Sequence, residues 1–161
     1  MSHHNADNWR SQYDRMTRWF DRLRVVLRED VLTDSELDFV YAFFINCYHL
    51  RDWLNKTPNS RFSQKSIEDL FSKDEASEAL KLCHDIATGL KHLTLSRPKI
   101  DANFAVVREY VAGGGEKWLI LADGKKWPIE DLAIDCMSAW DEFIRNAPID
   151  RRTTSERERP R

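Results

Sequence analysis

Histidine, aspartate and lysine side chains that could do chemistry interrupt two apolar stretches of this sequence. The first group contains His49 and Asp52, which are three residues apart. The second contains Asp85, Lys91 and His92, in which Asp85 and His92 are seven residues apart. Residues three or seven apart lie on one side of a helix. We therefore take these five residues as the candidate catalytic residues.

Two kinds of chemistry suit these side chains. Histidine and carboxylate ligands on facing helices can bind a transition metal, here through His49, Asp52, Asp85 and His92. Alternatively, His92 could act as an acid or base on a phosphodiester while Lys91 holds the anion. The ordinary interpretation, which we favour, is that Lys91 and His92 complete the C-terminus of a helix, where cations are stabilised. The sequence has no HExxH motif, and we expect neither a metal nor a cofactor.

The stretch from Asp34 to Asn55 must position these groups, because it predicts a long helix without proline or glycine. Asp34 or Ser35 is a plausible N-cap. One face is apolar at helical spacing, and the middle of the stretch is apolar nearly all round: Phe39, Val40, Tyr41, Ala42, Phe43, Phe44, Ile45, Cys47, Tyr48, Leu50 and Leu54. Such a helix needs neighbours on most sides. Asn46 lies inside this pattern and needs a hydrogen-bond partner.

Periodicity and turn residues predict the other elements. Further helices are expected at 8–28, 66–72, 74–93 and from 129 or 130 to 146. Before the last helix, β-branched and aromatic residues at 103–112 and 116–122 flank three glycines and predict a β-hairpin. Asp123-Gly124 predicts a tight turn into a brief third strand at 125–127. The fold class is therefore mainly α, a four-helix bundle with a small antiparallel β-hairpin or meander inserted before the last helix.

Composition indicates an ordinary globular domain. The chain has 161 residues, of which 42% are hydrophobic and 32% charged, and a formal net charge of −2. We expect one domain at 8–147, with disordered segments at 1–7 and 148–161. No apolar run is long enough to span a membrane and no signal-peptide core is present, so we expect a cytoplasmic protein without a membrane partner. Its three cysteines, Cys47, Cys83 and Cys136, are expected to be reduced core residues.

Two stretches carry a resemblance. The sequences FFINCYHLRDWL and LCHDIATGLKHLTL resemble signature segments of a family of small, uncharacterised bacterial helical proteins. The helical layout more loosely resembles the HEPN superfamily, helical bundles that include RNases and inactive binding members. HEPN nucleases carry an arginine followed after four to six residues by a histidine, and this chain has no such pair. The resemblance therefore implies a binding member rather than a nuclease.

We accordingly expect a non-catalytic, HEPN-like module that binds a protein or RNA partner. The alternative is a divergent RNase or metal-dependent hydrolase that uses the His49/Asp52 and Asp85/Lys91/His92 clusters. A homodimer is a further possibility, because Tyr41, Ile45 and Tyr48 lie opposite the main apolar face and need a cover.

Overall fold

Five helices and a small sheet make up the protein in a computed structural model, which describes residues 8–29, 32–57, 61–73, 77–91 and 97–147. The helices are α1 (Trp9–Val26), α2 (Asp34–Lys56), α3 (Gln64–Ser72), α4 (Glu78–Lys91) and α5 (Ile129–Asn146). The sheet is inserted between α4 and α5, as the sequence predicted. The predicted terminal segments and the predicted start of the third long helix at 74 lie outside the described residues. No helix in the described ranges is long and apolar enough to cross a membrane.

The central helix is α2, which contacts each of the other four helices. Its buried residues are Val40, Phe43, Phe44, Cys47, Leu50 and Leu54. Tyr48 is covered by the rings of Phe71 and His84, whereas Tyr41 and Ile45 stay half-buried. The prediction of a helix enclosed on most sides is therefore confirmed.

The N-cap of α2 is Thr33, so the choice between Asp34 and Ser35 was wrong. The Thr33 side chain accepts the backbone N–H of Glu36, and the Glu36 carboxylate accepts the backbone N–H of Thr33. This reciprocal capping box satisfies two backbone donors at once, and a cap one residue later in the chain would satisfy fewer.

A polar contact fixes α1 against α2. Gln12 is buried, and its Nε2 donates to the backbone oxygen of Asn46 at 2.8 Å and to Asn46 Oδ1 at 3.3 Å. Asn46 Nδ2 in turn donates to the carbonyl of Ala42. The partner that Asn46 was expected to need is therefore Gln12.

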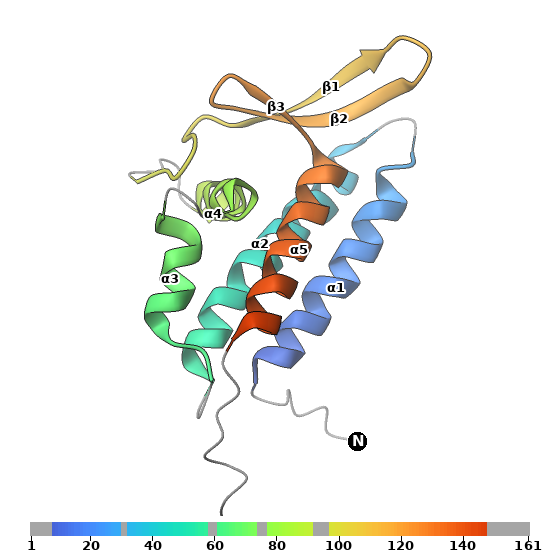
Figure 1. Ribbon diagram of the computed structural model, residues 1–161. Coiled ribbons are helices and arrows are strands. Elements are labelled where there is room, and N and C mark those ends of the chain that lie inside the picture. Colours follow the sequence, from blue (N-terminus) through green and yellow to red (C-terminus); the bar gives the residue numbers. More distant parts are fainter. Residues whose placement is uncertain (1–7, 30–31, 58–60, 74–76, 92–96, 148–161) are drawn as a thin grey trace, which may run out of the picture.

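The helices do not form a simple four-helix bundle. In Figure 1, α1, α2 and α5 run alongside one another, whereas α4 is seen nearly end-on and crosses them. The short α3 packs against α4 and α2. Helix α4 also contains Gly89, where an added Cβ would lie 2.9 Å from Cε1 of Phe104. The glycine lets the segment before the sheet approach α4 closely.

The sheet lies across one end of the helices (Figure 1). Its strands β1 (Ala105–Val111), β2 (Gly115–Ala122) and β3 (Lys125–Pro128) are antiparallel in the order β1-β2-β3. Asp123 and Gly124 both have positive φ at the β2–β3 turn, as an Asp-Gly hairpin turn requires. The predicted meander is confirmed, and β3 leads directly into α5.

Candidate anion-binding site

Asp85 organises the region where α4 meets the chain that leads to the sheet. Its side chain is fully buried. Oδ1 accepts the backbone N–H of Lys99 at 2.7 Å, and Oδ2 accepts those of Ile100 at 2.5 Å and Asp101 at 2.8 Å. Burial by itself would raise the pKa of Asp85, but the hydrogen bonds from His84 and these three amides lower it below its usual 3.8. Asp85 is therefore a buried carboxylate ion that holds residues 99–101 against α4.

His84 is oriented by the same carboxylate. Its Nδ1 lies 2.8 Å from Oδ1 of Asp85, and its ring meets the ring of Tyr48 edge-on, with centroids 5.2 Å apart. A proton on Nδ1 that faces Asp85 leaves Nε2 as the basic nitrogen of the neutral ring. This is the arrangement of a histidine that is held to accept a proton at Nε2.

Arg51 projects from α2 toward the same place. Its Nη1 donates to Tyr48 Oη at 2.5 Å, and its guanidinium lies over the rings of Tyr48 and Phe71. Its Nε is buried without a hydrogen-bond partner among the described residues, and no carboxylate there pairs with it. An arginine held by aromatic rings keeps its charge and several N–H donors for another acceptor.

These side chains line one pocket of about 340 Å³. The pocket lies between α2, α3, α4 and the segment that begins at residue 97, and its lining is Arg51, Glu68, Phe71, Ser72, His84, Arg97 and Lys99. Three cationic side chains face one carboxylate, so the pocket is positive although the whole chain is slightly acidic. The chemistry it fits is a phosphate or another anion.

Comparison with known proteins identified no relative of this chain. No protein family, curated protein or solved structure matches the chain. The likeness to HEPN bundles therefore stays a prediction, and the site must be judged by its own geometry.

Most of the predicted catalytic residues lie elsewhere. His49 is exposed on α2, Asp52 is half-buried one residue after Arg51, and Lys91 is exposed at the last position of α4. His92 lies outside the described residues. Asp85 does not line the pocket, but its carboxylate bonds to His84 and to the backbone N–H of Lys99, which do. The side of α4 that carries Asp85 is covered by residues 99–101, whose backbone N–H groups bond to its carboxylate.

None of the residues that line the pocket belongs to the predicted set, and its basic members are Arg51, His84, Arg97 and Lys99. The adjacent pair His84-Asp85 and the arginine at the end of an apolar helix were visible in the sequence. What brings them together is the turn of the chain at residues 97–101, which no helical period predicts. Arg97 and Lys99 reach the pocket only because Asp85 captures the backbone beside them.

The hypothesis of a metal site is tested only for its three candidate ligands in the described part of the chain, because His92 lies outside it. Among the described residues, the only group of three or more histidine, cysteine or acidic side chains close enough to share an ion is Cys47, Cys83 and Cys136. His49, Asp52 and Asp85 form no such group.

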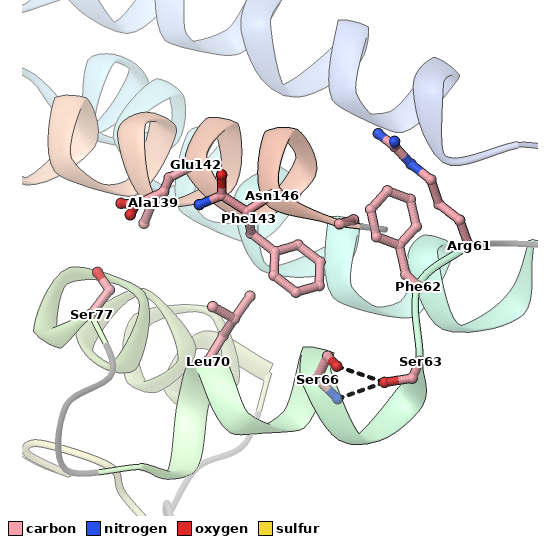
Figure 2. A pocket seen from close by; sticks show the side chains of 11 residues that line it. Arg61, Phe62, Ser63, Ser66, Leu70, Ser77, Ala139, Glu142, Phe143 and Asn146 are labelled. Atoms are coloured by element: carbon pink, nitrogen blue, oxygen red, sulfur yellow. Dashed lines mark hydrogen bonds between the residues drawn. The ribbon is translucent and has the colours of Figure 1, made fainter. Parts of the chain in front are cut away.

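A second hollow, of about 440 Å³, lies between α3 and α5. Figure 2 shows Leu70 and Phe143 facing each other across it, while Ser63 bonds to Ser66 at the start of α3. Its one guanidinium, that of Arg61, already donates to the carbonyl of Ile144. This hollow therefore lacks the converging charges of the pocket around Arg51.

Proposed function

We propose that the protein binds RNA and that the pocket of Arg51, His84, Arg97 and Lys99 takes a backbone phosphate. The observation that carries the proposal is Arg51, a partly enclosed guanidinium with a buried Nε that has no acceptor among the described residues. A buried donor without a partner costs free energy, and a phosphate oxygen would satisfy it. Arg97 and Lys99 add charge to the same pocket.

The charge distribution favours a local contact with a single strand. The formal net charge of −2 gives no broad positive face for a duplex. Three of the arginines of α1 are also engaged locally: Arg10 and Arg22 lie over Trp9 and Trp19, and Arg24 pairs with Glu130. A strand that places one or two phosphates in the pocket needs only the cations already there.

Binding can be measured by fluorescence anisotropy with a labelled single-stranded RNA of about ten nucleotides at several salt concentrations. If two phosphates are neutralised, the logarithm of the binding constant falls with the logarithm of salt with a slope of about −1.4. Changing Arg51→Gln or Lys99→Gln is expected to weaken binding at least about tenfold and to make the slope shallower.

The matched control is Arg22→Gln, because Arg22 also lies over an aromatic ring but on the exposed side of α1. It is expected to bind RNA as the unchanged protein does. Equal losses in Arg22→Gln and Arg51→Gln, or no binding by the unchanged protein at low salt, would contradict the proposal. Light scattering on the same sample checks the separate prediction of a homodimer.

The second candidate function is cleavage of the bound RNA, and the His84–Asp85 contact favours it. His84 Nε2 would take the proton of a 2′-hydroxyl, whose oxygen attacks the adjacent phosphorus. The bond to the 5′-oxygen breaks, that oxygen takes a proton from water, and a 2′,3′-cyclic phosphate is left. Arg51 would stabilise the charge on the phosphorus oxygens.

This reaction needs no metal and requires the 2′-hydroxyl, so two results are expected. RNA should be cut in the presence of EDTA, and DNA of the same sequence should stay intact. His84→Asn should abolish cleavage while leaving RNA binding within a few fold, whereas His49→Asn serves as the control with full activity. RNA binding without any cyclic-phosphate product would leave the protein a binding module only.

A further inference from the structure

The three cysteines of the chain meet in the core, although they are far apart in sequence. Cys47 comes from α2, Cys83 from α4 and Cys136 from α5, and their Sγ atoms lie within 4.8 Å of one another. All three are fully buried and none forms a disulfide. They stand where the three helices cross, so their sulfurs form one compact group rather than three separate core positions.

The surroundings of this group contain a donor without an ordinary acceptor. Trp140 is fully buried, and its Nε1 has no hydrogen-bond partner among the described residues. The indole N–H lies close enough to Cys47 to interact with its sulfur. An N–H donor beside a sulfur favours the thiolate form over the thiol. A thiolate is the form of cysteine that binds metal.

We propose that Cys47, Cys83 and Cys136 bind one copper(I) ion. The three ligand atoms that this group offers are all sulfur, and thiolates select copper(I) or zinc over harder metals. Zinc in protein sites takes four ligands, whereas the described residues offer three here. Copper(I) is satisfied by three sulfurs in a plane. At a metal–sulfur distance of about 2.3 Å, such sulfurs lie about 4 Å apart, so the group needs to contract by less than about 1 Å.

Binding involves no oxidation or reduction. Each thiol that becomes a thiolate forms one copper–sulfur bond and releases one proton to solvent, and the ion stays copper(I). The thiol protons are at present donated to carbonyls, from Cys83 to Phe44 at 3.3 Å and from Cys136 to Ala79 at 3.4 Å. Both carbonyls belong to helices, whose own hydrogen bonds remain when the thiol proton leaves.

The enclosure of the sulfurs decides how the test must be done. Because the group is closed to solvent, the ion has to enter as the chain folds. The full chain is therefore unfolded and refolded without oxygen in the presence of one equivalent of copper(I), held by a competing chelator, and then desalted. We expect one copper per chain, three sulfur neighbours in the X-ray absorption spectrum at the copper edge, and a higher Tm than the metal-free protein has.

The matched variants separate binding from packing. Cys136→Ala removes one sulfur, and we expect its copper(I) affinity to fall at least about tenfold and the rise in Tm on adding copper to disappear. Ala133→Gly disturbs the same buried side of α5 but keeps the three sulfurs, so it should retain copper. Both variants are first compared without metal by circular dichroism.

Three results would overturn the proposal. They are no copper retained by the unchanged protein, equal retention by Cys136→Ala, and retention of zinc but not copper when both are offered. If Cys136→Ala does not fold, the absorption spectrum of the unchanged protein still decides, because fewer than three sulfur neighbours would refute the site.

Discussion

Nδ1 of His84 lies 2.8 Å from Oδ1 of Asp85, and the same carboxylate accepts three backbone N–H groups from the segment that leads to the sheet. One buried side chain thus orients the histidine of the pocket and fixes the segment that carries Arg97 and Lys99. The relation continues through Asp101, which accepts the backbone N–H groups of Asn103 and Asp123. Two successive carboxylates therefore tie α4 to the sheet.

The first prediction concerns the neutral replacement of this carboxylate. Asp85→Asn keeps the size of the side chain but turns one oxygen into an NH₂ group, which cannot accept the backbone N–H bonds that the oxygen accepts now. We expect the free energy of unfolding to fall by roughly 2–4 kcal/mol, because buried N–H groups lose a charged acceptor. Urea denaturation measures it. Asp21→Asn, on the exposed side of α1, is the control and should change stability little.

The second prediction is a dependence of stability on pH. The pKa of Asp85 is lowered in the folded protein, so on acidification the unfolded chain takes up this proton first, near pH 3.8. Asp85 therefore contributes stability that is complete above about pH 5 and is lost as the pH falls through its folded pKa. Urea denaturation at several pH values should show a shallower acid slope for Asp85→Asn. Equal slopes would mean that Asp85 is not ionised in the fold.

A third prediction tests the close approach at Gly89. A Cβ here would lie 2.9 Å from the ring of Phe104, so Gly89→Ala should destabilise the protein although alanine is the better helix residue. In a Phe104→Leu background the clash is relieved, and the same change should stabilise by roughly 0.5–1 kcal/mol. Thermal unfolding of the four proteins gives the comparison. The same sign of effect in both backgrounds would rule out the ring as the cause.

The fourth prediction concerns the seam between α1 and α2. Gln12→Ala removes the NH₂ group that donates to the backbone oxygen and to Oδ1 of Asn46. The free energy of unfolding should fall by roughly 1–3 kcal/mol. A double-mutant cycle with Asn46→Ala should give a coupling free energy of about 0.5–1.5 kcal/mol. Additive effects would show that the two side chains stabilise the fold independently.

The proposed RNA site and the proposed copper site use different side chains, so each can be tested without disturbing the other. The pocket is lined by side chains of α2, α3, α4 and the segment that begins at residue 97, whereas the sulfurs belong to α2, α4 and α5 and are fully buried. Arg51→Gln should therefore leave copper binding unchanged, and Cys136→Ala should leave RNA binding unchanged.

The local pattern of residues determined the elements. Helical periodicity and an unbroken apolar stretch are enough to predict α2 as the central helix, and paired β-branched segments around glycines predict the sheet. The Asp123-Gly124 turn followed from its two residues, because positive φ there suits few others. The crossing of α4 was not predictable in this way, since it depends on which faces pack.

What only the tertiary structure decided is which polar and sulfur groups meet. Helical spacing placed Asp85 on one side of a helix, but only the fold shows that the chain returns over that side and buries the carboxylate beneath residues 99–101. Cys47, Cys83 and Cys136 looked like three unrelated core positions until three crossing helices brought their sulfurs together. Periodicity describes one helix at a time, whereas a site is made where several elements cross, and that depends on contacts between residues distant in sequence.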